Sequence, residues 1–195
     1  MYNMIEFKLF GDPAYQGEST WGLIIMVFPW RRRRTVPNPD SPVPEAPAES
    51  SLTLRLPFPP IAENGAALAQ LFHDSVLEID GVDLDYSAAS LEWVDGFLQQ
   101  HHDEGLTIAN FAETVFVAGC YVGEVMCRQA GGRWVDRDAL DPHGAGLLGM
   151  PILVALSNDS TANPVGKAFK RFEGDSTDNL MYFYRVFTSD DVAHA

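Results

Sequence analysis

The chain has 195 residues, of which 46% are hydrophobic and 11% aromatic, and its formal net charge is −14 at pH 7. This length favours one domain, or one domain with an appendage, and the apolar fraction suffices for an ordinary core. Because the overall charge is strongly negative, we exclude nucleic-acid binding through a general basic field of the main domain.

The negative charge is concentrated in one part of the chain. From Leu56 to Cys127 there are twelve acidic residues and neither lysine nor arginine. One sign of charge over a large area repels phosphate and attracts basic partners. The plain alternative is an acidic, solvated surface that keeps the protein soluble.

Residues 1–50 differ from the rest in composition, and we expect a weakly ordered N-terminal extension. An arginine run (Arg31, Arg32, Arg33 and Arg34) is followed by five prolines within residues 35–50, a composition typical of an extended linker. The arginine run is suited to weak contact with an anionic surface. Residues 1–25 are either a genuine segment or an upstream extension from a misassigned start.

Two features indicate a cytoplasmic protein. The most membrane-like stretch, Trp21–Trp30, has ten residues and precedes the arginines, whereas a spanning helix needs about twenty and a secretory signal has the opposite order. Cys120 and Cys127 are seven apart in an apolar helix, roughly 10 Å by helical rise, too far for a disulfide. We interpret them as buried thiols in a reducing compartment.

The ordered domain is expected to begin with a strand at residues 52–56, where apolar and other residues alternate. A helix should follow over 61–77, with Leu68, Leu71, Phe72 and Leu77 on one face. Residues 81–85 are a short strand or an extended connection, and Ser87 is a suitable N-cap for a helix that continues to Gln100.

The most apolar segment, 108–130, predicts a central, buried helix that ends at Gly131 and Gly132. Gly119 and Gly123 would let another backbone approach it closely. Strands are predicted at 133–135 and 151–156, and helices at 163–172, with Asn163 as cap, and at 176–187. The pattern predicts a single α+β domain over 51–190, with a small mixed sheet and four to five helices.

Two motifs in the sequence do not support the chemistry that they suggest. Gly144–Gly149 matches the dinucleotide fingerprint, but a strand rather than a helix follows it, so we reject nucleotide binding. His101–Glu104 contains metal-ligating residue types, yet adjacent histidines on a helix point about 100° apart. We therefore expect no metal and no cofactor.

Glu124 is the most informative single residue, because it is a lone carboxylate inside the apolar helix. An unpaired buried charge is costly, so Glu124 should have a partner or a raised pKa. Arg128 lies one turn on, which favours a structural ion pair. The functional alternative is a ligand cleft that Glu124 lines together with Arg133 and Trp134.

A second cationic cluster lies in the helix predicted at 163–172. Lys167 and Arg171 share a face at i, i+4, and Lys170 is adjacent to them. These cations either neutralise the acidic segment inside the domain or form an anion-binding ridge.

Several motifs resemble an uncharacterised group of bacterial domains. They are Leu84-Asp-Tyr-Ser87, Ala118-Gly-Cys-Tyr-Val-Gly-Glu-Val125, Gly131-Gly-Arg-Trp134 and the segment from Asn163 to Glu173. In that group a helix with a Gly-Glu-Val core leads through a glycine turn into a strand that opens with Trp. The resemblance covers about residues 80–187 and implies a domain with no assigned activity and no catalytic residue.

The sequence therefore leaves three functions open. We favour a non-catalytic binding domain whose acidic face takes a basic protein partner. The first alternative is an enzyme or small-ligand-binding domain with a cleft near Glu124 and Trp134. The second is a tethered domain whose arginine-rich tip contacts an anionic surface.

Overall fold

Helices make up most of the structure. The computed structural model describes residues 54–140, 149–174 and 179–189. Within these ranges the elements are, in chain order, a 3-10 turn (Ala62–Asn64), α1 (Gly65–Asp80), α2 (Ser90–Asp103), α3 (Ile108–Ala130), β1 (Arg133–Asp136), α4 (Arg137–Leu140), β2 (Ile152–Ala155), β3 (Thr161–Ala162), α5 (Pro164–Phe172) and α6 (Leu180–Thr188). The α+β class expected from the sequence is confirmed.

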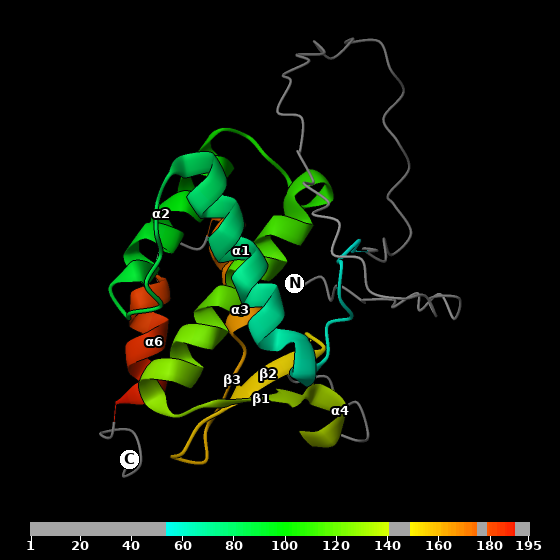
Figure 1. Cartoon of the computed structure of the whole chain (residues 1–195), viewed down its shortest axis with the longest axis vertical. Coiled ribbons are helices and arrows are strands. Elements are labelled where there is room, and N and C mark those ends of the chain that lie inside the picture. Colours follow the sequence, from blue (N-terminus) through cyan, green and yellow to red (C-terminus); the bar gives the residue numbers. More distant parts are fainter. Residues whose placement is uncertain (1–53, 141–148, 175–178, 190–195) are drawn as a thin grey trace.

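Helix α3 is the centre of the fold (Figure 1). It packs most extensively against α1 on one side and α5 on the other, while α2 contacts α5 and α6. A capping box between Thr107 and Asn110 starts α3, and Gly131, with a φ of 66°, ends it. Every residue from Ala118 to Met126 is buried, so the prediction of a central buried helix is confirmed.

The two glycines of α3 lie where other elements approach it most closely. A Cβ on Gly119 would lie 2.5 Å from Cα of Val165, at the start of α5. A Cβ on Gly123 would overlap with the indole of Trp134 in β1 and with the ring of Pro164. The predicted approach of another backbone is confirmed at Gly119, whereas the atoms nearest to Gly123 belong to the side chains of Trp134 and Pro164.

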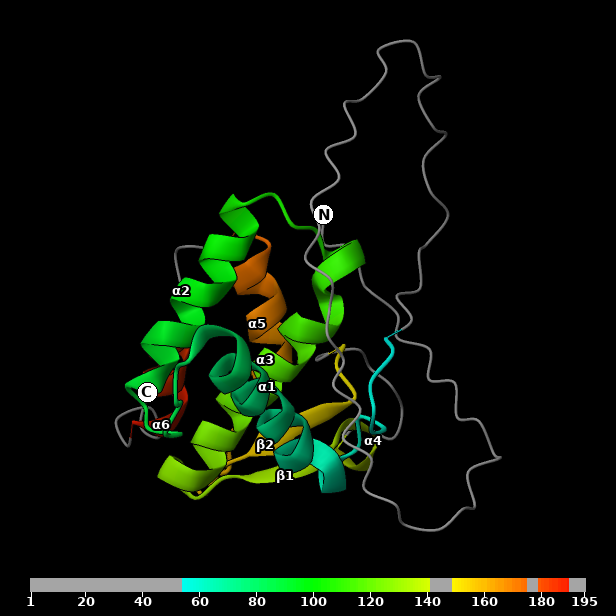
Figure 2. The same cartoon turned by 45° about the horizontal axis from the view of Figure 1, so that its top comes forward.

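The sheet lies at one end of the helical layer (Figure 2). Its order is β1-β2-β3, and both pairings are antiparallel, so it is not the mixed sheet that we expected. Trp134 pairs with Val154, and both pack against the helical core. Because side chains alternate across a strand, Val135 and its partner Leu153 point to the other face.

Asparagine side chains cap the N-termini of α5 and α6. The Asn163 carboxamide oxygen accepts a 2.7 Å hydrogen bond from the Gly166 backbone, as expected for the cap before Pro164. The Asn179 carboxamide oxygen accepts one of 2.8 Å from the Tyr182 backbone. Helix α6 therefore begins at Leu180; residues 176–178 of the helix predicted at 176–187 lie outside the described residues.

The N-terminal part of the domain corrects two expectations. Of the strand predicted at 52–56, residues 52 and 53 lie outside the described residues, and Leu54–Leu56 form no strand. The Arg55 backbone donates its hydrogen bond to a side-chain oxygen of Glu113 at 3.1 Å rather than to a neighbouring strand. Helix α1 begins at Gly65 rather than at Ile61 and extends to Asp80. The Ala62 backbone is instead tied to the Asp136 carboxylate at 2.7 Å, at the end of β1.

Two further observations concern membrane-spanning helices and the two cysteines. Among the described residues, no helix combines the length and the apolarity needed to cross a membrane. Cys120 and Cys127 are both free thiols, so the expectation that they form no disulfide is confirmed.

Candidate acidic docking surface

The acids of the cation-free segment divide into exposed and partnered groups. Eight are exposed in α1, in the connection that follows it, and in α2 with its C-cap: Asp74, Glu78, Asp80, Asp83, Asp85, Glu92, Asp103 and Glu104. We call these eight carboxylates the acidic surface. Among the described residues, the ion pairs that they form are those of Asp74 and Asp83 with His73.

His73 joins the end of α1 to the connection that follows. Its Nδ1 lies 2.9 Å from the Asp74 carboxylate and its Nε2 lies 3.1 Å from that of Asp83. A carboxylate only accepts, so the ring donates to both when it carries both protons. The imidazole also stacks on Tyr86, with ring centroids 5.6 Å apart.

Glu124 has two partners, one for each carboxylate oxygen. Arg128 donates from Nε to Oε1 at 2.9 Å, and Trp134 donates from its indole Nε1 to Oε2 at 3.1 Å. The Glu124 side chain is 10% exposed and that of Arg128 is 45% exposed. The indole of Trp134 fills the space between Gly65 of α1 and Gly123 of α3. This arrangement agrees with the structural ion pair between Glu124 and Arg128 that the sequence favours.

Tyr86 lies between Arg128, the partner of Glu124, and His73, the partner of two carboxylates of the acidic surface. The Arg128 guanidinium lies 3.6 Å from the centroid of its ring, a cation–π contact. Tyr86 has a φ of 57°, and this backbone is held by Tyr121, whose hydroxyl accepts from the Tyr86 amide at 2.9 Å. Burial raises the pKa of the Tyr86 hydroxyl to about 12, although Arg128 acts in the opposite direction.

The remaining predicted site residues lie elsewhere. Arg133 is exposed and, one residue from Trp134 in β1, points to the opposite face of the sheet, so it does not join Glu124. Lys167 and Arg171 are buried, at 5% and 6% exposure, rather than on a surface ridge. Lys170 is exposed between them.

Arg171 compensates an acid of the cation-free segment inside the fold. Its Nε donates to one oxygen of Asp95 and a terminal nitrogen donates to the other, both at 2.9 Å, and it also contacts Gln99. Asp95 accepts a further 2.9 Å bond from the Leu180 backbone at the start of α6. One carboxylate therefore joins α2, α5 and α6, and for Arg171 the contact agrees with the neutralising alternative.

The residues considered for metal binding have separate surroundings. His101 packs against the rings of Phe97 and Phe111, and its Nδ1 lies 2.8 Å from the Phe97 carbonyl. His102 meets the edge of Phe172. Within the described ranges, no three histidine, cysteine or acidic side chains are grouped closely enough to hold a metal ion. Residues 144–148 of the rejected glycine motif, and the run Arg31–Arg34, lie outside the described residues.

The thiols are also shielded from ionisation. Burial raises the pKa of the Cys120 thiol far above its ordinary value. Burial, together with the nearby Glu124 carboxylate, raises the pKa of Cys127 to about 12. Since the thiolate is the nucleophile, neither cysteine is suited to nucleophilic catalysis at neutral pH.

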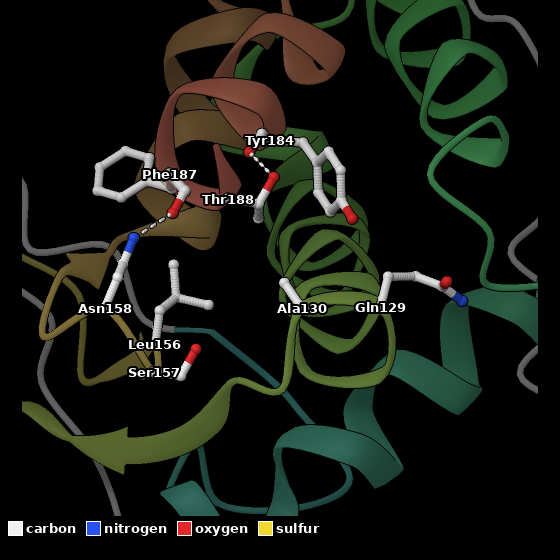
Figure 3. Close-up of a pocket in the computed structure, with 8 residues that line it drawn as sticks. All are labelled: Gln129, Ala130, Leu156, Ser157, Asn158, Tyr184, Phe187 and Thr188. Carbon is white, nitrogen blue, oxygen red and sulfur yellow. Dashed lines mark hydrogen bonds between the residues drawn. The ribbon is translucent and has the colours of Figure 1, made fainter. Parts of the chain in front are cut away.

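Two hollows on the described surface have linings that do not include Glu124 or Trp134. One of about 190 Å³ lies between the end of α3, the β2–β3 turn and α6, where Tyr184 and Gln129 stand opposite Phe187 and Asn158 (Figure 3). It is lined by Gln129, Ala130, Leu156, Ser157, Asn158, Tyr184, Phe187 and Thr188, which supply no carboxylate, imidazole, thiol or cation.

The other hollow is a shallow groove of about 500 Å³ between α2 and α6. Glu92 and Asp95 line it from α2, and Arg185 lines it from α6. Asp95 binds Arg171, so of these two carboxylates Glu92 is the one that belongs to the acidic surface.

Tyr86, His73 and Asp95 are the site residues that sequence reasoning missed. Tyr86 stood inside a quoted motif, but nothing in the local pattern shows that a ring will lie under Arg128. Asp95 follows the buried Val94 on a face with Leu91 and Leu98, and this semi-buried position was the available signal.

Comparison with protein-family models, with curated proteins and with solved structures finds no match.

Proposed function

We propose that this protein is a non-catalytic binding domain whose acidic surface takes a basic protein partner. The observation that carries the proposal is how the arginines are distributed. Arg171 and Arg128 are engaged by Asp95 and Glu124, which are largely buried. The eight exposed carboxylates have no lysine or arginine partner among the described residues, although His73 contacts Asp74 and Asp83. Their negative charge would attract a basic partner.

Exposed apolar side chains occur within the same surface. Leu77 is 44% exposed and Ile79 is 64% exposed, both in the last turn of α1 among Glu78 and Asp80. Purely electrostatic contacts between exposed charges are weak and screened over about 8–10 Å in salt. Apolar side chains between the carboxylates supply burial, which favours a partner with apolar residues beside its cations.

The geometry around Glu124 favours this function over a ligand cleft. Both oxygens of Glu124 have donors, and the indole of Trp134 fills the adjacent space. We also propose that the protein works in the cytoplasm, since its two thiols are free and one is fully buried.

Matched charge variants test the location of binding. The probe is fluorescein-labelled octa-arginine, measured by anisotropy with the full chain at low and moderate salt. We expect the combined changes Glu78→Gln, Asp80→Asn, Asp83→Asn and Glu92→Gln to weaken binding about tenfold. The control neutralises four other exposed acids (Glu63, Asp138, Asp159 and Glu173) and should change Kd less than twofold. Equal weakening by both sets would contradict the proposal, because binding would then follow net charge alone.

A further inference from the structure

Helix α6 carries more apolar residues than its contacts with the domain bury. It lies at the edge of the molecule beside α2 (Figure 1), and seven of its nine residues are aliphatic or aromatic. Leu180 and Phe183 are buried, while Met181, Tyr184 and Phe187 pack partly on the core. A helix that is apolar on all sides is normally covered on all sides, so α6 lacks a neighbour on its outer side.

The outer side of α6 is formed by an aromatic, an aliphatic and a cationic side chain. Tyr182 is 58% exposed and Val186 is 37% exposed, and because they are four residues apart they are neighbours on the helix surface. Arg185, three residues after Tyr182, is exposed on the same side. We call Tyr182, Arg185 and Val186 the α6 face. Tyrosine and arginine are enriched at the energetic centres of protein interfaces.

The groove beside the α6 face has charges of both signs. Arg185 lines it from α6 and Glu92 lines it from α2. Within the described ranges, neither side chain forms an ion pair. Arg185 opposes a purely basic partner here, and Glu92 opposes a purely acidic one. A surface that holds one charge of each sign is complementary to an identical surface when a twofold axis exchanges the two charges.

We infer that a second copy of this chain covers the α6 face, in a twofold-symmetric dimer whose two α6 helices pack antiparallel. Arg185 is in the C-terminal half of α6, and the groove is lined mainly by the N-terminal half, next to Glu92. Antiparallel packing therefore brings Arg185 of each copy to Glu92 of the other. Tyr182 and Val186 of both copies pack between the two ion pairs, and the two helix dipoles are opposed, which is favourable.

The dimer is expected to be weak. Its centre is one face of a nine-residue helix, and small interfaces are typical of transient association. The net charge of −14 on each chain also opposes association. We therefore expect a Kd on the order of 0.1 mM at physiological salt, so that dilute solutions contain the monomer.

Sedimentation velocity of the full chain measures this association. Between about 5 μM and about 1 mM, the average mass of the wild type should rise from that of the monomer towards twice that value. Tyr182→Ala should raise Kd about tenfold, because it removes the central ring of the contact. The control is Leu140→Ala, which truncates a 47% exposed side chain on α4 and should change Kd less than twofold.

Charge reversal tests the pairing between copies. Arg185→Glu and Glu92→Arg each place like charges at both contacts of the dimer, so each should raise Kd at least tenfold. In an equimolar mixture of these two variants, every contact between unlike chains again joins opposite charges, and association should approach that of the wild type. Mixing cannot repair an effect that lies within one chain. The control pair, Lys170→Glu and Glu173→Arg, makes the same charge changes at exposed positions and should associate like the wild type, alone and mixed.

Three results would overturn the inference. A wild-type chain that remains monomeric at about 1 mM would do so, and would leave the α6 face to a different protein. A mixture of the charge-reversal variants that associates no more tightly than either alone, or an equal gain on mixing the control pair, would do so as well. The proposed function fails separately, because Arg185→Glu removes a cation beside the acidic surface and should bind octa-arginine at least as tightly as the wild type.

Discussion

The indole of Trp134 donates a 3.1 Å hydrogen bond to Oε2 of Glu124, and this bond joins β1 to the central helix α3. Arg128 donates to the other oxygen at 2.9 Å, so the carboxylate has a donor on each side. The contact explains how an acid is accommodated in the most buried helix of the fold. It also makes Glu124 a structural residue, whose replacement should change stability rather than binding.

Glu124→Gln should lower the free energy of unfolding by about 1–3 kcal/mol, because the amide nitrogen must face Arg128 or Trp134, both of which are donors. Chemical denaturation measures this change. Glu92→Gln on exposed α2 is the control and should change stability by less than about 0.5 kcal/mol. Octa-arginine should bind the Glu124→Gln variant as it binds the wild type. An unaltered melting temperature with lost binding would instead support a cleft at Glu124.

Gly123→Ala should destabilise the protein by about 1–3 kcal/mol through overpacking, because the added methyl would lie 2.7 Å from Cζ2 of Trp134 and 2.9 Å from Cγ of Pro164. The matched control is Gly96→Ala in α2, where a Cβ meets nothing within 4 Å. That change should stabilise the helix by about 0.5–1 kcal/mol. Combining Gly123→Ala with Trp134→Leu should recover part of the loss. Strict additivity of the two changes would contradict the proposed contact.

Asp95→Asn should lower the free energy of unfolding by about 3–5 kcal/mol, because it removes the charge that Arg171 faces in a largely buried environment. Arg171→Lys should also destabilise, since an ammonium cannot reproduce the two parallel hydrogen bonds. The neighbouring exposed residue provides the control, and Lys170→Gln should change stability by less than about 0.5 kcal/mol. Independent, additive effects of changing Asp95 and Arg171 would argue against the pair.

The pKa of Tyr86, raised to about 12 from an ordinary value of 10.0, predicts a specific alkaline sensitivity. Above pH 10 the unfolded chain releases this proton before the folded one does, so stability is retained below pH 10 and falls as the pH rises towards 12. At pH 7, Tyr86→Phe loses the 3.0 Å bond to Gln70, about 0.5–1.5 kcal/mol. The difference in unfolding free energy between wild type and variant should shrink from pH 10 upwards. A constant difference would show that Tyr86 does not titrate abnormally.

The elements and contacts that sequence could predict depend on neighbouring residues. Asn163 followed by Pro164 marked the start of α5, and the spacing of Gly119 and Gly123 marked two close approaches to α3. Both signals act within a few residues, where backbone geometry leaves few alternatives. The Glu124–Arg128 pair was accessible for the same reason, since it lies within one helical turn.

The rest depends on partners that are distant in the chain. Asp95 and Arg171 are 76 residues apart, and the backbone donor of Arg55 is satisfied by Glu113, 58 residues away. Alternation at Leu54, Arg55 and Leu56 did indicate which side chains are partly buried, but not the absence of a neighbouring strand. Charge counting likewise identified the acidic segment, yet it could not distinguish Asp95 and Glu124 from the exposed carboxylates.

Amide chemical-shift mapping of the full chain during titration with octa-arginine tests most directly whether the acidic surface binds a basic partner. We expect the perturbations to concentrate in the second half of α1, the connection to α2 and α2 itself, and to disappear at high salt. Perturbations of the same size around Asp138, Asp159 and Glu173, or spread evenly over the domain, would contradict a dedicated acidic surface.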